Sequence, residues 1–175
     1  DWSSEVCSSD LAELCLDRSD PAGPQRVVAE FRGVAAIEAV RRREVTEDVE
    51  RVVEATVLHS GLGFESGGLS IAHAMTRGLS AVRGARDALH GHQVAYALLV
   101  QLALEGRDQA FVDDLATFYR ATDLPLSLTD LGMPDATDDE IDVIAAGTMT
   151  APHARNFQRT LSAADIAGAM RSIAR

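Results

Sequence analysis

The chain has 175 residues, which is enough for one domain with a substantial hydrophobic core and too few for two comfortable ones. Apolar residues make up 46% of it and charged residues 25%, a globular composition that excludes a disordered chain. The 27 acidic and 16 basic residues give a net charge of -11, so we expect no nucleic-acid partner and no anionic membrane partner. Two cysteines are too few to staple a secreted fold, which predicts a cytoplasmic protein.

The first eleven residues, DWSSEVCSSDL, differ from the rest of the chain. They are similar to the in-frame translation of a common sequencing adapter. We therefore interpret residues 1–11 as an adapter artefact, with native sequence over 12–175 that continues a longer protein. A native solvated tail is the alternative interpretation.

Apolar residues recur at spacings of three and four, and almost no segment alternates like a strand. The sequence thus predicts an all-α protein, a compact bundle of six to eight helices. The first helix is expected over 25–43 and the second from Thr46 to Gly61. The second helix is expected to bury a valine stripe: Val49, Val52, Val53 and Val57. Four glycines in residues 61–68, GLGFESGG, predict a loop.

The remaining helices are marked by caps and apolar faces. A short helix from Leu69 is expected to stop at Gly78, before a turn. The apolar run over 94–104, interrupted by Gln101, is too short to span a bilayer and predicts a central helix that closes at Gly106. A further helix is expected to begin after the cap residue Asp108 and to end at Leu124 and Pro125. Capping boxes at Thr137/Glu140 and Ser162/Asp165 predict the starts of the last two helices.

The candidate chemistry rests on histidines, because phosphate-binding loops, nucleophile elbows and HExxH pairs are absent from the sequence. His73 and His90 each lie in an apolar segment with small neighbours, and a turn separates them. They would face one another across adjoining helices, as ligands do in helical-bundle metal sites. A catalytic zinc takes three protein ligands, so the residues alone leave open either a metal site or a pair of structural histidines.

The run from Val52 to Gly106 has a GFESGGL loop, an AHA helix and an LHG segment that opens a long helix. This order is similar to the metal-binding core of the glycerol dehydrogenase family, within the iron-containing alcohol dehydrogenase superfamily. LAELC and TLSAADIAGAM resemble the same family's C-terminal domain, so the resemblance covers about Ala12–Arg175. It implies the C-terminal domain of a dehydroquinate synthase-like fold, with the N-terminal NAD-binding domain missing from this chain.

The resemblance also implies roles for particular residues. His73 and His90 match two ligands of a divalent metal, Zn²⁺ or alternatively Fe²⁺, and Phe64 matches an aromatic residue of the substrate pocket. The family's third ligand is an Asp in a GDALA-like segment that this chain does not contain. The implied reaction is oxidation of an alcohol or polyol to a ketone with NAD, in a homo-oligomer. We expect the 175 residues alone to be inactive.

Two departures from the family pattern put the substrate in question. Thr76 and Arg77 stand where many members have His and Asn, and His92 replaces a Glu. Arg77 either favours an acidic hydroxy compound or points to solvent. Two alternatives stay open: a superfamily relative acting on a hydroxy acid or another alcohol, and a stand-alone helical interaction module with structural histidines.

Overall fold

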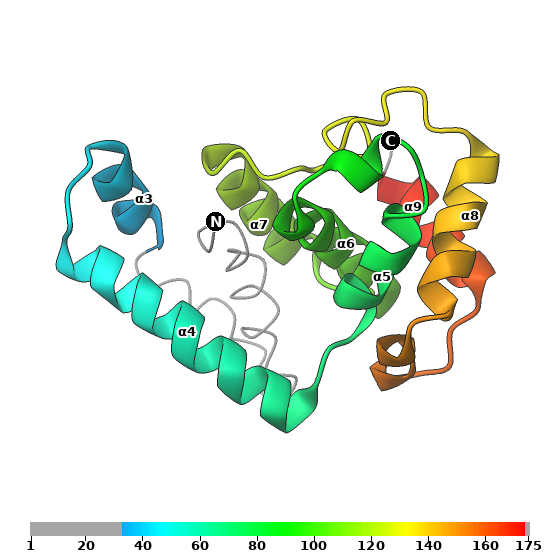
Figure 1. Cartoon of the computed structure of the whole chain (residues 1–175), viewed down its shortest axis with the longest axis horizontal. Helices are drawn as coiled ribbons and strands as arrows, with labels where there is room; N and C mark the ends of the chain where they lie inside the picture. The colour runs from blue at the N-terminus through cyan, green and yellow to red at the C-terminus, as the bar shows by residue number, and fades with distance from the viewer. Residues whose placement is uncertain (1–32, 174–175) are drawn as a thin grey trace. The chain divides into compact units, whose positions relative to one another are not determined.

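The computed structural model describes the backbone of residues 33–173, and their side chains except at 33–34, 59–60, 62–63 and 66–67. Every regular element in this range is helical, which confirms the all-α prediction (Figure 1). The predicted artefact at 1–11 and the first part of the helix expected over 25–43 lie outside the described residues.

The chain divides into two compact units at the bond between Gly67 and Gly68. Helices α3 (Gly33–Arg41) and α4 (Glu47–Gly67) belong to the first unit and pack on each other. All later helices belong to the second unit, which spans 68–175 and carries both candidate histidines. The sequence predicted a single compact bundle and gave no sign of this division.

Helix α4 begins as predicted but ends later. The Thr46 hydroxyl accepts a hydrogen bond from the Val49 N–H at 3.4 Å, as an N-cap does. The predicted end at Gly61 and the predicted loop over 61–68 are wrong, because the helix continues to Gly67. Each glycine in a helix interior costs only about 1 kcal/mol relative to alanine, so glycines alone do not terminate a helix.

The buried face of α4 also differs from the prediction. Ala55 and Thr56 are buried, whereas Val53 is 55% exposed and Val57 is 68% exposed. The predicted burial of the valine stripe is therefore wrong: Val49 and Val52 are half-buried, and Val53 and Val57 are exposed.

The second unit is organised around helix α6 (His90–Glu105), nearly all of whose side chains between Gly91 and Leu102 are buried. Helix α5 (Ile71–Leu79) packs on it, and the short 3-10 turn η2 (Ala85–Asp87) leads into it (Figure 1). Gly106 closes α6 with a left-handed φ of 65°, as predicted. The prediction that the apolar helix is central is confirmed.

Helix α5 ends at Leu79, one residue beyond the predicted stop, so Gly78 is its last residue but one. A Cβ atom there would collide with the carbonyl oxygen of Ile144 on helix α8 (Asp138–Met149). A Cβ on Gly147 of α8 would likewise lie 2.8 Å from the Gly78 Cα. These two glycines let the backbones of α5 and α8 approach more closely than side chains allow.

The remaining helices complete the unit. Asp108 caps helix α7 (Gln109–Ala121) by accepting from the Ala110 N–H at 2.8 Å, as predicted. The ring of Tyr119 on α7 packs with Ala95 and Leu99 of α6. The chain then passes through α8 and the 3-10 turn η3 (Pro152–Asn156) to helix α9 (Ala163–Ile173).

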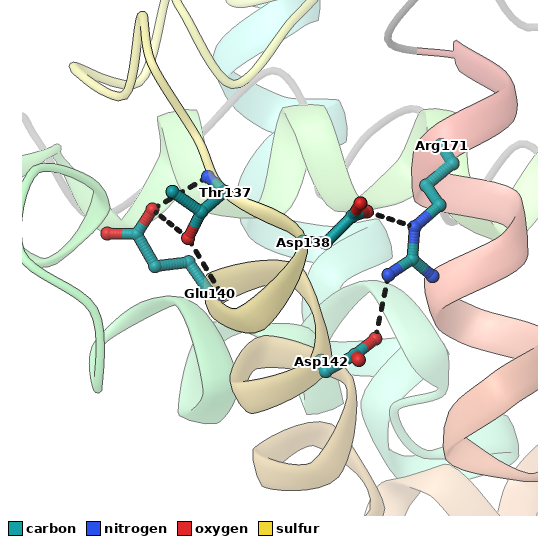
Figure 2. A network of polar contacts seen from close by, with 5 residues as sticks. All are labelled: Thr137, Asp138, Glu140, Asp142 and Arg171. Atoms are coloured by element: carbon teal, nitrogen blue, oxygen red, sulfur yellow. Dashed lines mark hydrogen bonds and ion pairs between the residues drawn. The ribbon is translucent and has the colours of Figure 1, made fainter.

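Polar contacts at the surface fix α8 and α9 (Figure 2). The predicted capping box is present: the Thr137 N–H donates to the Glu140 carboxylate at 2.8 Å, and the Glu140 N–H donates to the Thr137 hydroxyl at 3.3 Å. Ser162 and Asp165 repeat it before α9. Arg171 of α9 donates to Asp138 at 2.6 Å and to Asp142 at 2.9 Å, both on α8. None of the described helices is long and apolar enough to cross a membrane.

Candidate metal centre

The two candidate histidines come from the two helices that pack at the centre of the second unit. His73 is the third residue of α5 and is half-buried, and His90 is the first residue of α6 and is exposed. Their ring centroids lie 5.9 Å apart, with the ring planes inclined by 54°. The structure therefore brings together the two side chains that the sequence predicted to face one another.

Two imidazoles at this separation provide part of a ligand set. Zinc binds imidazole nitrogen at about 2.0–2.1 Å, so rings a few ångströms apart and inclined to each other are compatible with one shared ion. Within residues 33–173, no group of three or more His, Cys, Asp or Glu side chains converges on a point that would hold a metal.

Phe64, the predicted pocket residue, lies on α4 and is 56% exposed. It belongs to the first compact unit, whereas the two histidines belong to the second.

Of the residues that depart from the family pattern, Thr76 and Arg77 lie on α5 with His73, and His92 lies on α6. The Thr76 hydroxyl donates to the His73 carbonyl at 2.8 Å. Arg77 is exposed, and its guanidinium donates to the Thr150 carbonyl at 3.5 Å. Arg77 thus reaches toward the end of α8. Of the other histidines, His92 and His153 are half-buried, and the side chain of His59 lies outside the described residues.

A buried polar network ties the start of α5 to α6. The Ala72 N–H donates to Oε1 of Gln101 at 3.0 Å, and Nε2 of Gln101 donates to Glu105 at 3.1 Å. The Arg107 guanidinium donates to the other Glu105 oxygen at 2.9 Å. Sequence reasoning missed this network. The signal was the interruption of the apolar run at Gln101, because a buried amide in such a run requires partners.

A second buried amide joins α6 to the 3-10 turn η2 that precedes it. Nε2 of Gln93 donates to the Ala85 carbonyl in η2 at 2.8 Å, and Gln93 is 3% exposed. Three residues further along α6, Tyr96 is fully buried, and burial raises the pKa of its phenol well above the usual range. Tyr96 therefore stays neutral and serves the core.

No family model matches the chain, but proteins of known sequence and structure do. A glycerol dehydrogenase of Schizosaccharomyces pombe is 34% identical over 165 residues, which cover 93% of this chain and 34% of that protein. A glycolaldehyde reductase of Halobacterium salinarum is 37% identical over 135 residues, which cover 77% of this chain and 34% of that protein.

A solved structure gives the same picture. The crystal structure of a glycerol dehydrogenase from Schizosaccharomyces pombe superposes with a TM-score of 0.80 at 31% identity, over 98% of this chain and 48% of that one. The chain spans about a third of the length of the curated relatives it matches. The similarity therefore extends over nearly the whole of this chain and over a minor part of each relative.

Proposed function

The chain belongs to the glycerol dehydrogenase family, and from this premise we propose that it is the C-terminal, metal-binding helical part of an NAD-dependent dehydrogenase. The intact enzyme oxidises a small alcohol or polyol to a ketone. A hydroxy acid is the second substrate class, because Arg77 stands where many relatives have a neutral side chain.

One observation carries the proposal: His73 and His90, from different helices, present their rings to each other at 5.9 Å. Neutral imidazoles are ligands for Zn²⁺ and also for Fe²⁺, and we favour Zn²⁺. His73 and His90 would hold the cation, which would supply polarisation of the alcohol oxygen, and NAD would supply the hydride acceptor. The chain's own contribution is to hold the two imidazoles on packed helices, at fixed separation.

We propose that two parts of the active site, the cofactor site and the third metal ligand, are not supplied by this chain. It spans about a third of its relatives, so the cofactor site and the third ligand are assigned to parts of the protein beyond it. The 175 residues alone are expected to oxidise no glycerol with NAD. We further propose a cytoplasmic enzyme that is a homo-oligomer when intact.

The test is the thermal midpoint of the chain with and without Zn²⁺. A ligand that binds only the folded state stabilises it by RT ln(1 + [L]/Kd), or about 2.7 kcal/mol at 100 times Kd. For a chain of this size that corresponds to a rise of about 5–10 °C. We expect the rise in the wild-type chain and none in a His73→Ala/His90→Ala variant.

A His153→Ala variant is the matched control, because His153 is half-buried in η3 and lies outside the pair. It should keep the full rise. A rise that survives loss of both His73 and His90 would refute this site. A wild-type chain that binds no Zn²⁺ either lacks the third ligand or holds structural histidines, as a stand-alone helical module would. Restoring the family's upstream Asp-bearing segment and repeating the scan separates these two: a rise then supports the metal site, and no rise supports the helical module.

A further inference from the structure

We infer that Gln101 is a positioning residue that sets the place of His73 opposite His90; the inference rests on the proposed function of that pair. The side chain of Gln101 reaches from α6 to the first turn of α5, and the hydrogen bond joins residues 29 positions apart. The Ala72 N–H that it accepts belongs to the residue immediately before His73.

The first turn of an α-helix has N–H groups without partners inside the helix, and a side chain at the N-cap usually accepts one of them. In α5 the N-cap residue is Ser70, yet its side chain makes no capping hydrogen bond. Within the described part of the chain, its buried Oγ has no hydrogen-bond partner at all. The amide of Gln101, on the neighbouring helix α6, therefore accepts a first-turn N–H of α5 that the N-cap side chain leaves without a partner.

The Gln101 amide is itself held in one orientation. Oε1 faces the Ala72 N–H, and Nε2 donates to Glu105, one turn further along α6. Glu105 is held in turn by Arg107, just beyond the end of α6. The side chains of Gln101 and Glu105 are nearly inaccessible to water, so replacing these bonds with bonds to solvent is costly.

One helix thus carries both His90 and the group that fixes the helix of His73. A shift of the first turn of α5 would move His73 relative to His90 even if both helices stayed folded. Metal affinity depends on such fixed ligand geometry: loss of a partner that hydrogen-bonds a ligand side chain typically weakens binding 10- to 100-fold. Gln101 acts one residue away from the ligand, through the Ala72 N–H, so we expect an effect at the low end of that range.

The test compares two buried amides on the same helix. Gln101→Met removes the acceptor for the Ala72 N–H with little change in side-chain volume. Gln93→Met is the matched control, since Gln93 is equally buried on α6 and also bonds a backbone atom outside the helix, the Ala85 carbonyl. The control is demanding, because Gln93 lies one turn from His90 and is therefore closer to that ligand in sequence than Gln101 is.

The first readout needs no metal: it is the NMR cross-relaxation between the ring protons of His73 and His90. We expect Gln101→Met to lose this signal and Gln93→Met to keep it. Retention of the signal in Gln101→Met, or equal loss in both variants, would overturn the inference. Because the signal is measured without Zn²⁺, this test of Gln101 stays valid whether or not the chain binds Zn²⁺, and its outcome is distinguishable from that of the test of the proposed function.

A rescue separates positioning from general destabilisation. Gln101→Glu alone places two carboxylates together and should lose the ring signal. Adding Glu105→Gln removes the second carboxylate and supplies an amide donor at position 105, beside the carboxylate at position 101 that accepts from the Ala72 N–H, so the double variant should regain the signal. A folded double variant without the signal would contradict the inference, even if Gln101→Met does not fold.

The second readout is Zn²⁺ affinity, measured by competition with a chromogenic chelator. We expect Gln101→Met to bind about tenfold more weakly than wild type, and the double variant to approach wild type. Equal affinities for the wild-type chain and Gln101→Met would count against a positioning role.

Discussion

The contact between α5 and α6 and the contact between α8 and α9 both join two helices through polar side chains, but in opposite environments. At the first, Gln101 is 2% exposed and the Glu105 side chain is 2% exposed. At the second, the side chain of Arg171 is 39% exposed and its partners Asp138 and Asp142 are 80% and 64% exposed (Figure 2).

The difference follows from what water offers to each group. An exposed ion pair competes with solvent and salt, and typically contributes little to stability. The groups of a buried hydrogen bond cannot bond to water if that bond breaks, so the arrangement that keeps the bond is strongly preferred. The buried contact is thus suited to placing His73, while the exposed contact only helps to fasten α9.

The largest expected effect is at the other side of α5, where it meets α8. Gly78→Ala would drive its Cβ into the Ile144 carbonyl oxygen, and the Ile144 carbonyl carbon would lie 2.8 Å away. Because backbone must move, we expect a loss of about 2–3 kcal/mol. This corresponds to a melting temperature lowered by about 5–10 °C, measured by circular dichroism.

Gly168→Ala is the matched control, because Gly168 is an interior residue of α9 whose added Cβ would meet no atom within 4 Å. There the same substitution should stabilise the chain by about 0.5–1 kcal/mol, since alanine is the better helix former. Similar effects at both positions would mean that the close approach of α5 to α8 is not a constraint.

The next effect compares the two arginine contacts directly. Arg107→Met leaves the buried Glu105 carboxylate with Gln101 as its remaining polar partner and should cost about 2 kcal/mol. Arg171→Met removes an exposed arginine and should change the melting temperature by no more than about 2 °C.

Salt sharpens this second comparison. Raising the ionic strength should erase the small effect of Arg171→Met and leave that of Arg107→Met largely intact, because burial limits screening. An Arg171 variant that is the less stable of the two would reverse the ranking that burial predicts.

The contrast between these regions also explains what the sequence was able to predict. The exposed caps at Thr137/Glu140 and Ser162/Asp165 are local signals within four residues, so they were located correctly. The juxtaposition of His73 and His90 followed from two apolar helical segments joined by a turn, and the rings are indeed adjacent.

The missed features depend on contacts distant in sequence. A glycine that ends a helix and a glycine that admits a neighbouring backbone look alike in one sequence, so the close approach of α8 at Gly78 was not predicted. Gln101 was visible as a polar break in an apolar run, but its partner lies 29 residues earlier in the chain. The division at Gly67 and Gly68 lies where α4 extends beyond its predicted end.

The smallest expected effect concerns the exposed caps and their pH dependence. Hydrogen bonds from the Thr137 N–H and hydroxyl lower the pKa of Glu140, and those from the Ser162 hydroxyl and N–H lower the pKa of Asp165. A carboxylate whose pKa is lower in the folded state stabilises the fold fully above its unfolded pKa, ordinarily about 4.5 for Glu and 3.8 for Asp. That contribution is lost as the pH falls through the folded-state values.

The variant Glu140→Gln/Asp165→Asn should therefore melt slightly below wild type at neutral pH. The gap should close as the pH falls below about 4, because the wild-type carboxyl groups are then also neutral. Thermal scans from neutral pH to about pH 3 measure this gap, with Asp114→Asn, an exposed carboxylate in the middle of α7, as the control. If the difference in melting temperature between wild type and variant widens toward low pH, the fold favours the protonated carboxyl groups. That outcome would contradict the direction in which the hydrogen bonds shift the pKa values.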